Sequence, residues 1–277
     1  MKIDAHQHFW RLARGDYGWL TADLDPIHRD FLPHDLAPLL AQAGVESTVL
    51  VQAAPSVAET AFLLDLAART QFVAGVVGWI DFEAPNAADQ IAALARSPKL
   101  VGLRPMIQDL ADDAWMLRPS LAPAIEALIA AGLTFDALVK PRHLPILSRF
   151  VDRWPGLRLV IDHGAKPDIA AGALQPWADD IRAVAGNPAT FCKLSGLVTE
   201  AGPGWAETDL SPFIDLLIDA FGPERLMWGS DWPVVNLAAR YDDWLDVASR
   251  ALAGRLGPAD HDRVFGRTGA AFYGLKA

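Results

Sequence analysis

Eight short runs of strand-forming residues alternate with helical patterns along the chain, and this alternation limits the possible folds more than any other feature. Most of these runs are rich in Val, Ile, Leu or Phe and are bounded by Gly, Pro, Asn or Asp, as strands commonly are. Because strands that alternate with helices form parallel sheets with right-handed crossovers, the pattern predicts an α/β protein. The predicted strands cover residues 2–6, 46–53, 71–80, 99–106, 134–140, 157–163, 190–196 and 225–231.

Helical periodicity fills the intervals between these strands. In residues 209–222, apolar side chains recur at steps of three and four, and aspartates lie off that stripe. Ser211 followed by Pro212 predicts the start of this helix, and Gly222 predicts its end. Similar patterns predict helices over residues 34–43, 56–69, 87–96, 120–131, 143–154, 176–185 and 241–252.

Two architectures accommodate eight parallel strands, a closed (β/α)₈ TIM barrel and an open doubly wound sheet. The open sheet usually carries a glycine-rich phosphate-binding turn after an early strand, and the sequence contains neither the G-x-G-x-x-G nor the G-x-x-x-x-G-K-[ST] pattern. Gly and Pro are spread along the chain, so no stretch looks like a linker between domains. The prediction is therefore a single barrel domain over residues 1–277.

Composition excludes several classes of protein. The formal net charge is −10, which argues against a broad basic surface for nucleic acid or anionic membranes. No apolar run approaches the ~18 residues that span a bilayer, and His6 and His8 lie where a signal peptide would need its apolar segment. Cys192 is the single cysteine, so a disulfide framework is excluded. We expect a cytoplasmic protein without nucleic-acid or membrane partners.

The first candidate site feature is the triplet His6-Gln7-His8 at the end of the first strand. On an extended segment, side chains at positions i and i+2 point to the same side. Both imidazoles would therefore face the carboxyl-end mouth of the barrel, where active sites of this fold lie. Two converging imidazoles suit a divalent metal such as zinc, and the alternative is a polar pair on the surface.

His163 and Asp231 end the sixth and eighth predicted strands. His163 is expected on the strand face that Leu159 and Ile161 share, and it would supply a third imidazole at the mouth. The carboxylate of Asp231 would stay ionised beside imidazoles or a metal and can accept a proton from water. The alternatives are a hydrogen-bonded core histidine and an aspartate that caps the following segment.

Basic side chains at strand ends form a further candidate group. Arg104 and Lys166 are the preferred pair for stabilising an oxyanion or binding substrate. Lys140 ends the fifth strand, and Lys193 lies in the seventh with either orientation open. Long basic side chains more often lie on the solvated surface.

Predictions for three other residues follow from their positions relative to the predicted strands and helices. Trp79 ends the third strand, where its aromatic face would suit a sugar-like or planar substrate, although packing is the commoner role. His28 lies in the long first connection and is predicted to reach over the mouth as part of a lid. His143 is predicted to lie on the surface.

The motifs taken together resemble the amidohydrolase superfamily, its amidohydrolase-2 branch and, within that branch, the sugar-lactone hydrolases. The resemblance covers nearly the whole chain in order, and the joint pattern is specific although each piece alone is weak. The resembling segments are IDAHQHFW (3–10), VVGWIDF (76–82), LVIDHGAKP (159–167), CKLSGLVTEA (192–201) and FGPERLMWGSDWPV (221–234).

The resemblance implies a (β/α)₈ barrel with one site at its mouth. The paired histidines of the superfamily fall on His6 and His8, its later histidine on His163, and its acid on Asp231. Two alternatives stay open, one divalent metal ion, preferably zinc, held by these four residues, and a site that works without metal. A two-metal centre is not expected, because no second histidine ends the fifth strand.

The resemblance implies hydrolysis of a small-molecule aldonolactone, such as L-fuconolactone or L-rhamnonolactone, to the hydroxy acid. Asp231 would be the general base and His163 a second catalytic residue, with Arg104, Lys166, Trp79 and His28 binding substrate. Three alternatives remain: hydrolysis of an acidic lactone of the muconolactone or pyrone dicarboxylate type, metal-dependent non-oxidative decarboxylation, and binding without catalysis.

Overall fold

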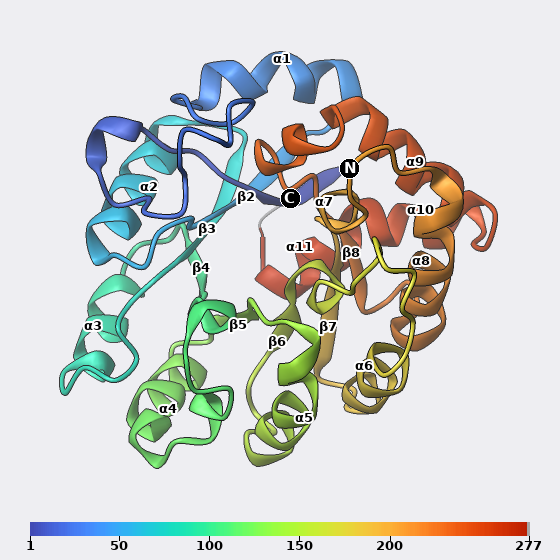
Figure 1. The fold of residues 1–277 in the computed structure, drawn as a ribbon. Coiled ribbons are helices and arrows are strands. Elements are labelled where there is room, and N and C mark those ends of the chain that lie inside the picture. The colour runs from blue at the N-terminus through green and yellow to red at the C-terminus, as the bar shows by residue number, and fades with distance from the viewer. Residues whose placement is uncertain (276–277) are drawn as a thin grey trace.

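The computed structural model describes residues 1–275, which form a ring of eight parallel strands surrounded by helices (Figure 1). The strands are hydrogen-bonded in chain order, so each neighbours the next along the sequence. This confirms the predicted (β/α)₈ barrel. The strands are β1 (Ile3–Gln7), β2 (Ser47–Val51), β3 (Val73–Gly78), β4 (Leu100–Leu103), β5 (Thr134–Ala137), β6 (Leu159–Ile161), β7 (Thr190–Leu194) and β8 (Leu226–Trp228).

The ring closes between β1 and β8 through individual backbone hydrogen bonds beyond the end of β8. The amide of Asp231 donates to the carbonyl of His6 at 2.8 Å, and the amide of His8 donates to the carbonyl of Trp232 at 2.7 Å. The closure therefore runs through the segment that carries the predicted functional residues. It brings positions separated by more than 200 residues in the chain into direct contact.

The outer layer of the barrel consists of helices that pack their apolar faces on the strands (Figure 1). All eight helices predicted from periodicity are present, and apart from the start of α8 their ends lie within two residues of the expected ones. They are α1 (Pro33–Ala43), α2 (Val57–Arg69), α3 (Ala87–Leu94), α4 (Ala122–Ala130), α5 (Leu144–Arg153), α6 (Trp177–Ala185), α8 (Glu207–Phe221) and α9 (Tyr241–Ala253). Three short helices are added, α7 (Leu197–Glu200), α10 (Pro258–Asp262) and α11 (Thr268–Tyr273).

The predicted start of α8 is wrong. The helix begins at Glu207, and Pro212 lies inside it. A carboxylate oxygen of Asp209 accepts a hydrogen bond from the amide of Ala206 at 2.8 Å, which satisfies one donor of the first turn. Pro212 is the sixth residue of the helix, so it removes one amide donor that would otherwise bond the carbonyl of Thr208. The predicted end at Gly222 is confirmed.

Two apolar clusters hold the layers together. The larger one lies between strands and helices. The smaller one joins side chains from opposite strands, such as Val49, Val160 and Met227, with Phe272 and Tyr273 of α11. This second cluster occupies part of the barrel interior.

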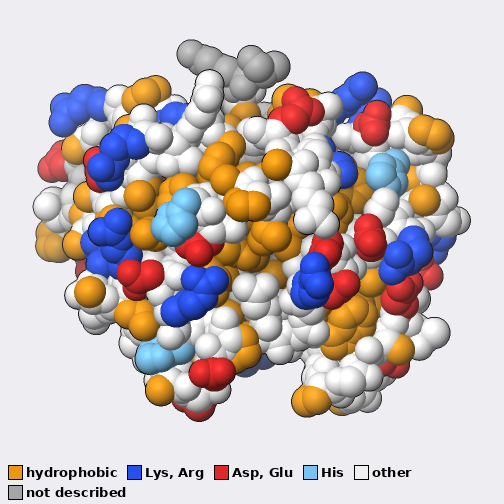
Figure 2. All heavy atoms as spheres, turned by 90° about the horizontal axis from the view of Figure 1, so that it is seen from above, with side chains coloured by type: hydrophobic (Ala, Val, Ile, Leu, Met, Phe, Trp, Pro, Cys, Tyr) orange, Lys and Arg blue, Asp and Glu red, His pale blue; other side chains and the backbone are white. Residues whose placement is uncertain are grey.

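The surface carries charges of both signs. On the face that Figure 2 shows, Lys and Arg side chains are interspersed with Asp and Glu, and hydrophobic side chains gather between them. Within the described residues, no helix combines the length and the hydropathy that a membrane crossing requires.

Candidate active site

A small cavity of about 200 Å³ opens at the carboxyl ends of the strands. Five residues singled out from the sequence line it, and they come from the ends of four strands or the loops that follow them, since His163 and Lys166 both follow β6. This is the mouth where enzymes of this fold carry their sites. The lining includes His8, Arg104, His163, Lys166 and Asp231, together with Trp19, Ala53, Met106, Gln108, Asp109, Leu138 and Val234.

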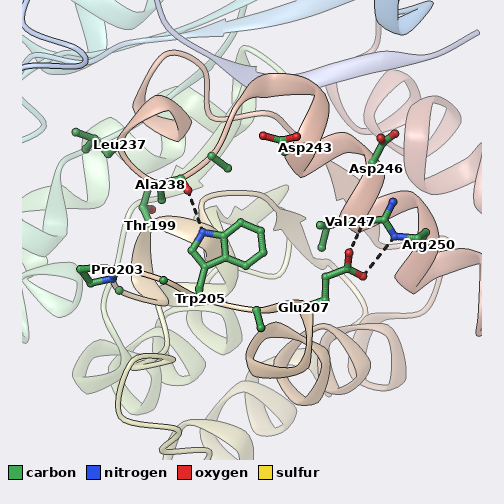
Figure 3. Close-up of a pocket in the computed structure, with 14 residues that line it drawn as sticks. Thr199, Pro203, Trp205, Glu207, Leu237, Ala238, Asp243, Asp246, Val247 and Arg250 are labelled. Carbon is green, nitrogen blue, oxygen red and sulfur yellow. Dashed lines mark hydrogen bonds and ion pairs between the residues drawn. The ribbon is translucent and has the colours of Figure 1, made fainter.

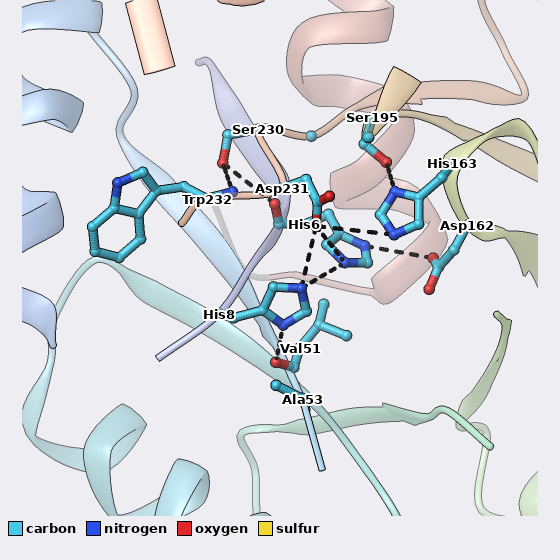
Figure 4. A network of polar contacts seen from close by, with 12 residues as sticks. His6, His8, Val51, Ala53, Asp162, His163, Ser195, Ser230, Asp231 and Trp232 are labelled. Atoms are coloured by element: carbon cyan, nitrogen blue, oxygen red, sulfur yellow. Dashed lines mark hydrogen bonds and ion pairs between the residues drawn. The ribbon is translucent and has the colours of Figure 1, made fainter. Parts of the chain in front are cut away.

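The two histidines of the first strand converge as the i, i+2 spacing predicts (Figure 4). Their Nε2 atoms lie 3.2 Å apart. Nδ1 of His8 lies 2.8 Å from the carbonyl oxygen of Val51, which only accepts, so His8 carries its proton on Nδ1. Its Nε2 therefore offers a lone pair toward the cavity.

His163 and Asp231 reach the same point by a different route from the one predicted. Both have left-handed backbones, with φ of 55° and 59°. The prediction that His163 shares a strand face with Leu159 and Ile161 is wrong, because β6 ends at Ile161 and those two side chains pack in the larger core cluster. Such backbone strain is typical of functional sites, where the surrounding structure holds it in place.

Gly196, which follows the end of β7, leaves space for the left-handed turn at His163. A Cβ atom at Gly196 would lie 2.5 Å from Nδ1 of His163 and 3.1 Å from a carboxylate oxygen of Asp231. Gly196 also has a φ of 62°, so a side chain there would be strained as well as blocked. The hydroxyl of Ser195 lies 2.9 Å from Nδ1 of His163 and orients the ring.

The four groups surround one point. Oδ1 of Asp231 lies 3.3 Å from Nε2 of His8, 3.6 Å from Nε2 of His6 and 3.9 Å from Nε2 of His163. Zinc bonds of about 2.0–2.1 Å place tetrahedral ligands about 3.3 Å apart. His6, His163 and Asp231 also each offer one atom within 4.8 Å of the others. The residues therefore fit a divalent metal ion.

Burial and neighbouring charges set the protonation of this cluster. Burial alone would raise the pKa of Asp231, but the charges and hydrogen bonds of the three histidines outweigh it and hold that pKa well below its usual range. Burial lowers the pKa of His163 to about 4, and it also holds the pKa of His6 well below its ordinary value, with the Lys193 charge adding to the effect. At neutral pH, the cluster therefore combines the neutral imidazoles of His6 and His163 with the ionised carboxylate of Asp231.

Beneath the cavity lies a buried ionic network that the sequence reasoning missed. The Lys193 side chain, whose orientation the sequence left open, points into the barrel and is 0% exposed. Its Nζ lies 2.6 Å from Asp136, 3.0 Å from Asp162 and 3.1 Å from Nδ1 of His6. Tyr273 also donates to Asp136, at 2.5 Å. The network fixes the back of the His6 ring.

The two preferred basic residues differ in how they are held. Arg104 is 3% exposed, and its guanidinium donates to Asp162 at 3.1 Å and to the Gln52 side chain at 3.0 Å. Lys166 is partly exposed and pairs loosely with Glu200 at 3.9 Å. Lys166 is therefore the more adaptable cation of the two.

Gln108 also lines the cavity and was not singled out from the sequence. Its side-chain oxygen is buried and has no hydrogen-bond partner among the described residues. A buried acceptor without a partner is costly, so a substrate hydroxyl could satisfy it. No sequence motif marks this residue, because its position depends on the loop after β4.

The remaining predicted residues lie elsewhere. Trp79 lines a neighbouring cavity rather than this one, and His28 lines neither. Lys140 is exposed, outside both linings. The prediction that His143 lies on the surface is wrong, because it is 0% exposed and its Nδ1 accepts from the amide of Lys140 at 3.0 Å.

A choice of candidate site by cavity volume alone would favour a different part of the molecule. A groove of about 990 Å³ lies between the start of α8 and helix α9 (Figure 3). The indole of Trp205 donates to the carbonyl of Ala238 at 2.9 Å, and Glu207 pairs with Arg250. The lining contains no histidine among the described residues, so it lacks the cluster found at the barrel mouth.

A barrel whose mouth gathers three imidazoles and an ionised carboxylate defines an enzyme that can hold a divalent metal and activate water. The chain belongs to the family described as "Amidohydrolase", whose family model matches residues 3–275. This confirms the resemblance found in the motifs.

Individual relatives agree with this assignment. The chain is 51% identical to an L-fucono-1,5-lactonase of Burkholderia ambifaria, covering 98% of this chain and 95% of that one. It is 41% identical to an L-fucono-1,5-lactonase of Burkholderia multivorans, with 99% and 96% covered. A crystal structure of a Burkholderia multivorans amidohydrolase with bound zinc has a TM-score of 0.95 at 40% identity, with 100% of each chain covered.

Proposed function

We propose that the protein hydrolyses a neutral sugar-acid lactone, an aldonolactone such as L-fuconolactone or L-rhamnonolactone, to the open hydroxy acid. The observation that carries this proposal is the meeting of the Asp231 carboxylate with three imidazoles at one small cavity. The two L-fucono-1,5-lactonases similar to the chain over nearly its whole length support the substrate class.

Asp231 acts as the general base in the proposed reaction. Its carboxylate takes one proton from water as the water oxygen bonds to the lactone carbonyl carbon. The bond from that carbon to the ring oxygen then breaks, and Asp231 returns the proton to the departing alkoxide. Because an alkoxide leaves more readily than an amine anion, a lactone needs less activation than an amide.

The other residues bind and orient. His163 is neutral above pH about 4, so when no metal ion is bound its ring can hydrogen-bond the attacking water. Lys166 and Arg104 line the same cavity and would stabilise negative charge on the carbonyl oxygen.

We propose zinc as the metal that fits this cluster, held by His6, His8, His163 and Asp231. The zinc-bound relative supports this choice. A bound divalent ion would polarise the carbonyl and lower the pKa of water. The proton transfers assigned above to Asp231 and the hydrogen bond assigned to His163 are made by these two side chains themselves.

The cations of the cavity favour a neutral lactone. Arg104 is already paired with Asp162, which leaves Lys166 as the adaptable cation among the lining residues. A substrate with several carboxylates would need more positive charge than this to offset its desolvation.

The function is tested with a pH-indicator assay on a panel of lactones, run with chelator-treated and zinc-loaded protein. We expect turnover of L-fucono- and L-rhamnonolactone and at least tenfold lower kcat/KM on pyrone dicarboxylate and muconolactone. The two protein preparations separate the metal requirement from the reaction class. Preference for the acidic lactones, or the absence of turnover across the panel, would refute the proposal.

The pH profile of the reaction is expected to reflect His163. Burial lowers its pKa to about 4, so the neutral ring persists through the mildly acidic range. We expect kcat/KM to stay constant from about pH 7 to about pH 5 and to fall below that as His163 becomes protonated. The measurement is initial rate against pH, corrected for spontaneous hydrolysis. An acid limb with a midpoint near 6.5 would instead indicate an unshifted histidine.

A further inference from the structure

We call the cavity of about 200 Å³ that holds His8, His163 and Asp231 the catalytic cavity. A second cavity of about 530 Å³ lies beside it, above the carboxyl ends of the first four strands. The two cavities share Trp19, Met106 and Asp109 in their linings, so they are neighbouring compartments of one mouth. We call this second cavity the aromatic chamber. It is lined by Asp16, Gly18, Trp19, Pro55, Trp79, Ile80, Asp81, Phe82, Glu83, Pro105, Met106, Asp109, Leu110 and Trp115.

Two of the three indole rings of the aromatic chamber are fixed by hydrogen bonds, and the third tryptophan is anchored through its backbone. Trp19 donates from Nε1 to the carbonyl of Ala53 at 2.7 Å, and Trp115 donates from Nε1 to Glu83 at 3.0 Å. Thr60 holds the backbone of Trp79 on both sides, with its hydroxyl 2.7 Å from the amide and 2.8 Å from the carbonyl. Such rings bind with little loss of side-chain entropy, because they are ordered before a ligand arrives.

The charged groups of the aromatic chamber are all acidic. Asp16, Asp81, Glu83 and Asp109 line it, and no Lys or Arg is among its lining residues. Asp16 and Glu83 are held by arginines outside the lining, Arg14 at 2.6 Å and Arg118 at 2.7 Å. An anionic ligand would meet only like charge here, whereas hydroxyl groups would find carboxylate acceptors.

We propose that the aromatic chamber binds a neutral sugar ring attached to the lactone, so that the substrates include the lactones of oxidised disaccharides. Indole faces pack on the apolar face of a sugar ring, and carboxylates accept hydrogen bonds from its hydroxyls. The catalytic cavity alone is smaller than the usual ~300–1,000 Å³ of ligand sites, and the two compartments together fall within that range. This inference rests on the proposed lactone hydrolysis.

The substrate test compares lactones that share one ring and differ in the attached sugar. D-Glucono-1,5-lactone is measured against cellobiono-1,5-lactone and melibiono-1,5-lactone, which carry a second sugar at different hydroxyls. We expect kcat/KM to be about tenfold higher for at least one of the disaccharide lactones. Trp79→Ala is expected to remove this ratio, and Trp154→Ala, at a partly exposed tryptophan of the α5 end, is expected to keep it. Equal kcat/KM on all three lactones, or a ratio that survives Trp79→Ala, would overturn the inference.

A binding measurement tests the aromatic chamber without catalysis. Methyl β-D-glucopyranoside is titrated into the intact protein and followed by tryptophan fluorescence, with D-glucuronate as the anionic counterpart. We expect saturable quenching by the glycoside alone, lost in Trp79→Ala and kept in Trp154→Ala. No saturable quenching by the glycoside, or equal quenching by D-glucuronate, would overturn the aromatic chamber as a sugar site. A protein that quenches normally but hydrolyses no lactone would refute the proposed function instead.

Discussion

Replacing Asp231 with asparagine is expected to lower kcat of lactone hydrolysis by a factor on the order of 10²–10⁴ while the barrel stays folded. The amide cannot take a proton from water, so the proposed base is lost. The side chain keeps its size, and asparagine is among the few residues that tolerate the φ of 59° at this position. Steady-state rates on L-fuconolactone measure the loss, and circular dichroism with thermal melting checks the fold.

A matched variant separates this effect from a general loss of acidic charge. Asp246→Asn changes an exposed aspartate on α9, outside the catalytic cavity, and is expected to keep kcat within twofold of the wild-type value. If Asp231→Asn retained turnover near the wild-type level, Asp231 would have no role as a base. If both variants lost activity equally, the loss would come from the overall charge of the protein.

The strands and the first-strand histidines could be predicted because their signals are local. Alternating apolar runs and helical periodicity marked every strand and every long helix of the barrel. The i, i+2 spacing of His6 and His8 placed two imidazoles on one side of an extended segment, and their Nε2 atoms are indeed 3.2 Å apart. Barrel closure then brought Asp231 to them, since the eighth strand must return beside the first.

The exact approach of His163 could not be derived from strand alternation. Its ring reaches the cavity through a left-handed turn after β6, and alternation describes only regular extended backbone. His143 was misplaced for a similar reason. It looks polar in sequence, but its ring is buried and bonds the amide of Lys140, a local contact that composition does not encode.

The ionic network and the aromatic chamber depend on contacts between segments far apart in the chain. Lys193 lies in a strand whose register the sequence does not fix, and a shift of one residue would turn it outward. Its partner Asp136 lies in β5, and its partner Asp162 lies in the turn directly after β6. The aromatic chamber is assembled from loops after four strands, and loop conformation has no periodic signal.

Replacing Lys193 with methionine is expected to destabilise the protein by about 3–5 kcal/mol. The substitution keeps much of the side-chain volume but removes the positive charge between Asp136 and Asp162, both fully buried. Burial already raises the pKa of Asp136, and the Lys193 charge is the main influence that opposes this rise. Without the lysine, the two carboxyl groups would face each other with less compensation. Denaturant unfolding followed by fluorescence measures the free energy of unfolding.

Two companion variants decide whether the loss comes from unpaired buried charge. Lys193→Met combined with Asp136→Asn is expected to recover part of the stability, because Asp162 keeps its contact with Arg104 at 3.1 Å. Lys166→Met removes a partly exposed lysine whose partner Glu200 lies 3.9 Å away, and it is expected to cost less than about 1 kcal/mol. A loss below about 1 kcal/mol for Lys193→Met, or a double variant less stable than the single one, would contradict a stabilising ion pair at this position. Since Lys193 also contacts Nδ1 of His6 at 3.1 Å, the same loss would loosen the back of the histidine cluster.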